Sequence, residues 1–302
     1  MKSSPASPSR EPSPPLAALS IYQLARLNCR ERLLVDPLYW TSRHVSLLQC
    51  HFDSPAPAPS PSESLTVSTD GQPNQKVIDH VKRLCSRGQA FRRDIGICGI
   101  LTGPGCPFTY ENNLDFYFDG RRIRTLPCIV FFLGDDPVAA AKGHLPPVAA
   151  FINRSDIKHL RADTFSKRYP RRYSKPTYSL LKLQFKKIIP PEPLHDPYIV
   201  ALLISLAYEQ RYFAQRSGQE NQVDQSFLSQ VLVANDKENL HLFTADISSS
   251  FLHKLDFPAL PPPGPVPPIV SIRHTMIPFS PFETFRERLL QCLLPTSDNH
   301  SS

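Results

Sequence analysis

Apolar residues dominate one long segment of the chain, from Tyr198 to Ala207, in which no side chain is charged. Asp196 and Pro197 precede it and form a helix-start signal, an N-cap residue followed by proline at the first helical position. The pattern predicts a helix over residues 197–216, with polar last turns. A helix that is apolar on every face must be covered on every face, so we expect the flanking segments to surround it.

A β-hairpin is predicted between residues 112 and 133. Apolar and polar residues alternate along its first strand, and Asp119-Gly120 is typical of a type I′ turn. The return strand is apolar on both faces after Cys128, which favours a central place in a sheet. Pro127 cannot donate a hydrogen bond and therefore indicates an edge or a bulge at its own position.

The C-terminal half, residues 176–294, predicts elements in the order β-α-β-β-α-β-α. The first strand follows from the alternation of Leu181, Leu183 and Phe185 with polar neighbours. Together with the upstream hairpin, this order predicts an α+β fold with a mixed β-sheet packed around the buried apolar helix. The further predicted strands are 227–234, 240–247 and 269–276. Two further helices are predicted: a short one capped by Ser248, and a last one over 281–294 that begins with a capping box at 280–283.

The N-terminal half predicts three further elements. Apolar residues recur about every 3.6 residues over 16–34 and over 76–88, which predicts two amphipathic helices. The apolar segment 95–101 predicts a strand that leads into the Gly103-Pro104-Gly105 turn. Neither a Walker A lysine nor a GxGxxG pattern accompanies these glycines, so we do not predict a phosphate-binding loop.

Proline and serine divide the chain into segments. We expect a disordered tail over 1–15, an N-terminal helical extension over 16–53, a main α+β domain over 76–295 and a second disordered tail over 296–302. Residues 54–75 begin with SPAPAPSPS and are predicted to be a Pro/Ser-rich linker. A long surface loop within one domain is the alternative interpretation of this segment.

The composition limits the cellular compartments in which we expect the protein and excludes several classes of protein. The chain of 302 residues carries seven cysteines without a CxxC pair, so we expect neither a disulfide framework nor a structural zinc site. The polar N-terminus lacks the apolar core of a secretory signal, and no apolar run reaches the roughly 20 residues of a membrane span. We therefore expect a protein of the cytoplasm or nucleus, with no membrane partner.

The net charge of +7 is concentrated between Lys158 and Lys187, where Asp163 is the only acid. Such a segment attracts phosphates or acidic surfaces, and a solvated connector is the alternative. Aromatic and basic residues interleave over 165–173, which suits base stacking but equally suits a loop that packs its tyrosines on the body. The candidate binding residues are Lys167, Arg168, Arg171, Arg172, Tyr173 and Lys175.

A second interpretation compares the chain with nucleases of the PD-(D/E)xK class. These enzymes hold Mg²⁺ with a carboxylate on one strand and a D/E/Q-x-K triplet on the next, where residues i and i+2 share a face. The candidate catalytic residues are Asp115 on the hairpin and Gln184 and Lys186 on the strand before the long helix. Three observations count against the nuclease interpretation. The two strands are far apart in the sequence, glutamine is a weaker Mg²⁺ ligand than a carboxylate, and Gln184 and Lys186 could simply face solvent.

Other enzyme classes leave no motif in the sequence. Neither a GxSxG elbow nor an HExxH helix occurs. His241 and His253 lie in or beside the last predicted strands, and we expect each at the surface or at a sheet edge. No cofactor is predicted apart from the Mg²⁺ of the nuclease interpretation.

Three C-terminal blocks carry a resemblance to known sequences. They are HDPYIVALLISLA (195–207), LHLFTADIS (240–248) and PFETFRERL (281–289), and the segment 110–124 adds to them. Over about its last two thirds the chain resembles a family of uncharacterised proteins from filamentous fungi. The resemblance implies a fungal source, and no established activity or catalytic residue comes with it.

These patterns lead to two competing expectations. The first is a non-enzymatic intracellular binding module that binds a protein or a polyanion, such as nucleic acid, through the basic segment 158–187. The second is a divergent Mg²⁺-dependent nuclease-like protein that acts on nucleic acid. The second requires Asp115, Gln184 and Lys186 to converge in one cleft, and the first does not.

Overall fold

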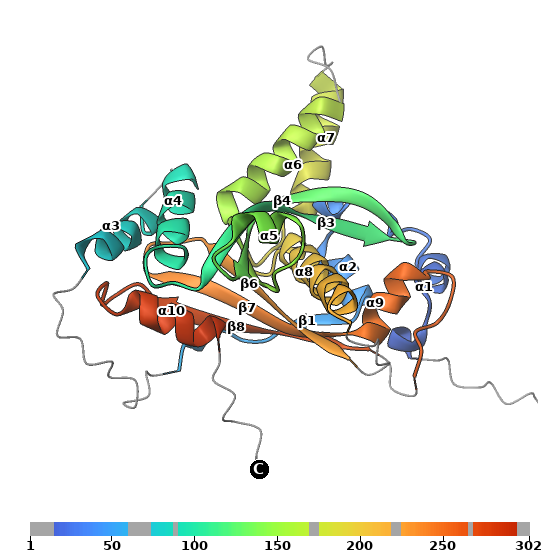
Figure 1. Ribbon diagram of the computed structural model, residues 1–302. Helices are drawn as coiled ribbons and strands as arrows, with labels where there is room; N and C mark the ends of the chain where they lie inside the picture. Colours follow the sequence, from blue (N-terminus) through green and yellow to red (C-terminus); the bar gives the residue numbers. More distant parts are fainter. Residues whose placement is uncertain are drawn as a thin grey trace, which may run out of the picture.

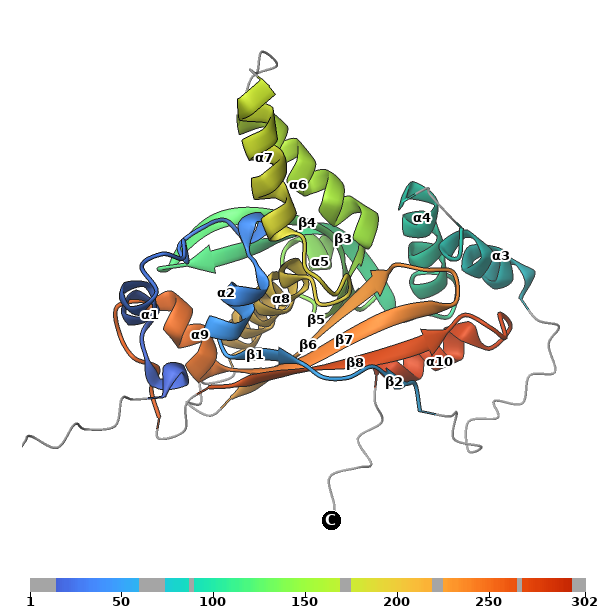
Figure 2. The same ribbon diagram turned by 180° about the vertical axis from the view of Figure 1, so that it is seen from behind.

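The computed structural model describes residues 15–59, 74–86, 90–168, 175–218, 225–264 and 268–294. Its centre is a mixed sheet in the order β1-β8-β7-β6-β5-β4-β3, with β2 pairing further along β8 (Figures 1 and 2). β1 and β2 run parallel to β8, β5 runs parallel to β6, and the other neighbours are antiparallel. The strands are β1 (Cys50–Phe52), β2 (Ala56–Pro57), β3 (Phe108–Phe118), β4 (Arg121–Leu133), β5 (Pro147–Asn153), β6 (Ser226–Ala234), β7 (Asn239–Ser248) and β8 (Val270–Pro278).

Helices cover both faces of the sheet, which confirms the predicted α+β fold. Figures 1 and 2 show α8, α9, α1 and α2 gathered on one face, and α3, α4 and α10 on the other. The α-helices are α1 (Ile21–Leu27), α2 (Ser42–Leu47), α3 (Gln75–Leu84), α4 (Ala90–Leu101), α5 (Pro137–Ala141), α6 (Arg154–Arg168), α7 (Lys175–Ile188), α8 (Pro197–Arg216), α9 (Ser249–Asp256) and α10 (Phe285–Leu293); two short 3₁₀ helices are η1 (Leu16–Ala18) and η2 (Pro37–Tyr39).

The central strands are buried on both faces and supply two separate cores. Successive side chains of a strand point to opposite faces. Ala150 and Val231 therefore belong to the apolar cluster around α8, and their neighbours Phe151 and Leu232 belong to the cluster under α3, α4 and α10. This explains why the strands read as continuous apolar runs rather than as a simple alternation.

The long apolar helix is confirmed as α8. Every residue from Pro197 to Tyr208 is buried, against β3, β5, β6 and β7 and under α2 and η2. Asp196 accepts a hydrogen bond from the backbone N–H of Tyr198 at 2.9 Å and so caps the helix as predicted. The more polar second half reaches solvent, where Tyr212 is 53 % exposed.

The predicted hairpin is confirmed as β3 and β4. Asp119 and Gly120 have φ angles of 54° and 66°, the pair of positive values that a type I′ turn requires. The strand register shifts between Asn112 and Leu114, which face Ile129 and Leu126. Pro127 and Cys128 therefore oppose Asn113 alone, and the bulge lies at Pro127, as predicted. β4 lies between β3 and β5, as its apolar second half predicted.

Two predicted strands are helices. The alternation over 181–186 was misleading, because this segment belongs to α7. Apart from Pro176 in its first turn, α7 is rich in leucine and lysine, which are good helix formers. A short alternation did not outweigh that propensity, and the first strand of the predicted C-terminal order is absent from the described residues 175–188.

The segment 95–101, also predicted as a strand, is the second half of α4. The two glycines of this segment serve close packing between helices. A Cβ on Gly96 would lie 2.8 Å from the backbone of His80 and Leu84 on α3, and one on Gly99 would lie 2.2 Å from the His80 ring. Both glycines therefore let α3 approach α4 closely.

The N-terminal segment contributes to the same sheet and core as the rest of the body. The helix predicted over 16–34 is shorter, since α1 ends at Leu27 before Asn28. Leu24, Trp40 and Leu48 belong to the apolar cluster around α8, and β1 and β2 pair with β8. Residues 16–53 thus pack directly against the segment that was predicted as the main domain.

The remaining C-terminal elements are close to their predicted positions. β6, β7 and β8 match the three predicted strands, and Ser248 caps α9 by accepting the N–H of Phe251 at 3.1 Å. The last helix, α10, begins at Phe285 behind Thr284 instead of at residue 281. The predicted capping box at 280–283 is therefore wrong.

Candidate functional site

Helices α6 and α7 contact one another and project from the body as a helical hairpin (Figures 1 and 2). The solvent side of α7 combines apolar and basic side chains. Leu180 and Leu183 are 61 % and 58 % exposed, and Lys186 and Lys187 are exposed beside them. These four residues, spaced three or four apart, form one continuous surface that we call the α7 patch.

A buried ion pair fixes the base of this hairpin. The guanidinium of Arg161 on α6 donates to both carboxylate oxygens of Asp196, at 2.6 and 2.7 Å, and its Nε donates to the Leu38 carbonyl at 3.1 Å. The Arg161 side chain is 2 % exposed. Because Asp196 also caps α8, this bidentate pair connects α6, η2 and α8 at one point.

The structure describes little of the candidate binding segment. Arg171, Arg172 and Tyr173 lie outside the described residues, as do the side chains of the other three candidates. The binding role of this segment therefore stays a prediction. Lys167 and Arg168 belong to the last turn of α6, and Lys175 begins α7.

The candidate nuclease residues do not have the predicted geometry. Gln184 and Lys186 are exposed on helix α7, where residues two apart lie about 200° apart around the axis and do not share a face. Asp115 on β3 accepts a hydrogen bond from Thr125 at 2.8 Å and forms an ion pair with Arg122 at 3.2 Å. Across the described part of the chain, no bond joins Asp115 to Gln184 or Lys186.

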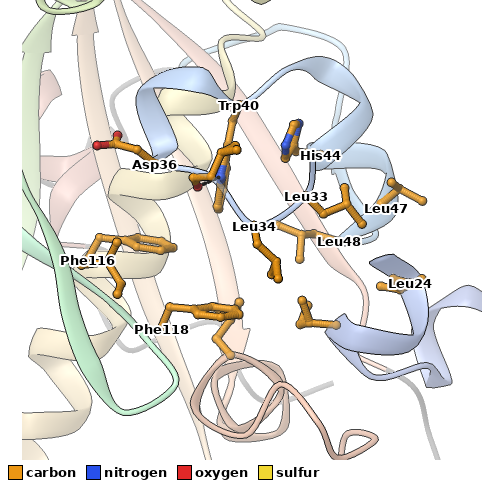
Figure 3. Close-up of a pocket in the computed structure, with 14 residues that line it drawn as sticks. Leu24, Leu33, Leu34, Asp36, Trp40, His44, Leu47, Leu48, Phe116 and Phe118 are labelled. Carbon is orange, nitrogen blue, oxygen red and sulfur yellow. Dashed lines mark hydrogen bonds between the residues drawn. The ribbon is translucent and has the colours of Figure 1, made fainter. Parts of the chain in front are cut away.

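An apolar pocket of about 210 Å³ lies between the N-terminal segment, the β3–β4 hairpin and α9. Figure 3 shows Phe116 and Phe118 of β3 facing leucines that include Leu33, Leu34 and Leu48. Leu34 is 54 % exposed and marks the open side. The sequence did not predict this pocket, because its walls come from segments about 80 and 220 residues apart along the chain.

The polar residues of this pocket are already bonded within the protein. Asp36 accepts the N–H of Leu38 at 2.9 Å and pairs with Arg124 at 3.2 Å. Both ring nitrogens of His44 have partners at 3.0 Å, and burial lowers the pKa of His44, which favours its neutral form. Trp40 donates its indole N–H to the Val35 carbonyl. The pocket therefore offers a ligand apolar contacts only.

Two buried histidines form a pair that the sequence analysis missed. His241 on β7 and His274 on β8 are each 3 % exposed, with Nδ1 of the first 3.0 Å from Nε2 of the second. His241 Nε2 lies 2.8 Å from a carboxylate oxygen of Asp236 in the β6–β7 turn. The surface position predicted for His241 was wrong because β7 is buried on both faces. The signal was its two apolar neighbours, Leu240 and Leu242.

The surroundings of His274 disfavour its charged form. Burial, with smaller contributions from the nearby His241 and His195, lowers the pKa of His274 to about 4. When His241 donates from Nε2 to Asp236, its Nδ1 accepts from His274, and Nδ1 of His274 is left as a buried acceptor without a partner. The arrangement makes the stability of the β7–β8 pair depend on pH.

Comparison with family models, with curated proteins and with solved structures finds no match to this chain. None of the helices in the described ranges combines the length and the apolar character that crossing a membrane requires. Over the same ranges, no group of three or more His, Cys, Asp or Glu side chains is arranged to hold a metal ion. The surfaces and cavities of the protein itself are therefore the evidence for its function.

Proposed function

We propose that the protein is a non-enzymatic intracellular binding module that docks an acidic protein segment on the α7 patch. The observation that carries this proposal is the exposure of Leu180 and Leu183 beside Lys186 and Lys187 on a projecting hairpin. Two leucines in water, one helical turn apart, gain free energy when a partner covers them. A hairpin that projects from the body presents them without obstruction.

The charge of α7 selects the chemistry of the partner. Its sequence contains four lysines and no Asp or Glu, so an acidic surface is complementary to it. Single-stranded nucleic acid is bound by cationic grooves with aromatic side chains on which bases stack. The α7 patch instead offers leucines beside lysines, which favours an amphipathic helix with Glu or Asp around an apolar stripe.

The test uses a labelled synthetic helix with leucines spaced three and four apart and glutamates on the flanks, measured by fluorescence anisotropy against the full chain. We expect binding that weakens with salt, because the charges are exposed. Leu183→Ser should weaken it about tenfold, in line with partial burial of one leucine. Lys186→Glu with Lys187→Glu should abolish it.

Matched controls separate the patch from general charge and apolarity. Leu260→Ser removes a leucine that is 53 % exposed on another surface, and Lys76→Glu with Lys237→Glu makes the same charge change elsewhere. Both should bind like the wild type. A single-stranded oligonucleotide that binds equally well, with no loss in Leu183→Ser, would show a polyanion site and refute the proposal.

The pocket in Figure 3 favours a second candidate function, the binding of a small neutral apolar molecule. Its volume of about 210 Å³ exceeds the roughly 150 Å³ of a dry cavity that admits benzene. Trp40 lines the pocket, so energy transfer from its indole to phenylnaphthylamine reports occupancy. Leu34→Glu places a charge at the opening and should weaken binding, whereas Leu260→Glu, at an almost equal exposure, should not. Equal binding by both variants contradicts this function.

A further inference from the structure

A second cavity, of about 410 Å³, lies at the carboxyl end of β5 between α4 and α6. Its walls also include residues of β3 and β4 at the bulge that contains Pro127. This cleft is separate from the α7 patch and from the apolar pocket, and nothing in the proposed function depends on it.

The cleft is acidic in a basic protein. The chain carries a net charge of +7, yet the lining includes Asp94, Asp156 and Asp163 and, among the described residues, no lysine or arginine. His159 and Cys128 are its other titratable side chains. Burial raises the pKa of Asp94, the hydrogen bond from the Asn153 amide opposes that rise, and the charge of Asp156 adds to it. A cation in the cleft would relieve this repulsion.

Asn153 provides a second, independent sign of a missing ligand. It lines the cleft at the end of β5 and is 1 % exposed. Its Nδ2 donates to Asp94 at 2.7 Å and to Asp156 at 3.3 Å, which fixes the orientation of the amide. Its Oδ1 is buried and has no partner among the described residues. Among Asp94, Asn153 and Asp156, the hydrogen-bond acceptors thus outnumber the donors, and one acceptor is left without a partner.

We propose that this cleft binds a small organic amine, whose ammonium group donates to Oδ1 of Asn153 and to the carboxylates of Asp94 and Asp156. An ammonium has three N–H donors, which matches these three acceptor groups. The carbon body of the amine then lies against apolar residues of the lining, such as Ile129 and Leu160. The carboxylates are not gathered as a metal site within the described ranges, and the cavity is far larger than an ion needs.

Benzylamine is the probe, and benzyl alcohol is its neutral control of nearly the same shape. Binding to the full chain is measured by titration calorimetry and by the melting temperature. Benzylamine should bind and raise the melting temperature, and benzyl alcohol should do neither. Asp94→Asn and Asp156→Asn, which keep the side-chain shape, should each weaken binding about tenfold, as the loss of one charge-assisted hydrogen bond predicts. Asp135→Asn, at an exposed site outside the cleft, should bind like the wild type.

Three results would overturn the proposal. The first is that wild-type protein, shown to be folded by its melting curve, neither binds millimolar benzylamine nor rises in melting temperature. The second is equal binding of benzyl alcohol, which would mean that charge has no part in recognition. The third is a rise in melting temperature with magnesium chloride that Asp94→Asn abolishes while benzylamine has no effect, which would identify a metal site.

Discussion

The buried imidazole of His274 should make the protein lose stability as the pH falls toward 4. In the unfolded chain this histidine has its ordinary pKa of 6.5, and in the fold its pKa is about 4. Below pH 6.5 the unfolded state therefore binds a proton that the folded state does not. The free energy of unfolding decreases between these two pH values and levels off below the lower one.

The magnitude follows from the same two values. A difference of about 2.5 in pKa corresponds to about 3 kcal/mol at 1.36 kcal/mol per pKa unit. The groups that surround the ring explain the direction. Burial is the largest cause, His241 on β7 and His195 before α8 also lower the pKa of His274, and Glu192 raises it. Phe243 stacks on the ring with centroids 4.5 Å apart.

The assay is guanidinium unfolding, followed by the fluorescence of the single tryptophan, Trp40, at pH values from about 7.5 to 4.5. His274→Phe keeps an aromatic ring against Phe243 but cannot take a proton, so its stability should vary less with pH than that of the wild type. His51→Phe removes an exposed histidine and should keep the wild-type slope. If the free energy of unfolding falls equally with pH in the wild type and in His274→Phe, the reasoning is refuted, because groups other than His274 then cause the loss of stability.

Three further predictions concern packing and accessibility. Arg161→Leu leaves the carboxylate of Asp196 buried without its partner and should reduce the free energy of unfolding by about 3–5 kcal/mol in guanidinium; an unchanged midpoint contradicts this. Gly96→Ala forces a Cβ to within 2.8 Å of the α3 backbone and should cost about 1–3 kcal/mol in the same assay. A thiol reagent should label Cys29 quickly in the native protein and Cys50 slowly, because only the first is exposed and burial raises the pKa of the second to about 12; equal rates would contradict the fold around β1.

Elements whose local sequence and tertiary surroundings favour the same structure were predictable from the sequence. The helix α8 is apolar on all sides because protein covers all sides, and its Asp-Pro start leaves little choice of boundary. The β3–β4 turn needs two positive φ angles, and Asp119-Gly120 supplies them. In both cases local chemistry and tertiary packing favour the same structure.

The wrongly predicted elements are those whose sequence pattern fits two different structures. Leu181, Leu183 and Phe185 alternate with polar residues, but α7 exposes Leu183 to solvent, so the apolar positions do not mark a buried strand face. Gly96 and Gly99 were placed in a predicted strand, whereas they permit close contact between two helices. Neither cause is visible until the neighbouring element is known.

The candidate sites were harder to predict than the fold. The cleft depends on Asp94, Asn153 and Asp156, which come from α4, β5 and α6, and α4 was predicted as a strand. No short motif joins these three residues. Leu183 was assigned to the apolar face of a strand, so the sequence pointed to the basic character of the hairpin but not to its exposed apolar component.

The pairing of β1 with β8 has a consequence for the order of events during synthesis. Cys50 faces Val270 across this edge, so more than two hundred residues are translated before the early strand meets its neighbour. Until then β7 also lacks its partner β8, and an unpaired apolar edge is open to other chains. A nascent chain stalled before residue 270 should therefore aggregate or recruit chaperones, and release of the finished chain should complete the sheet.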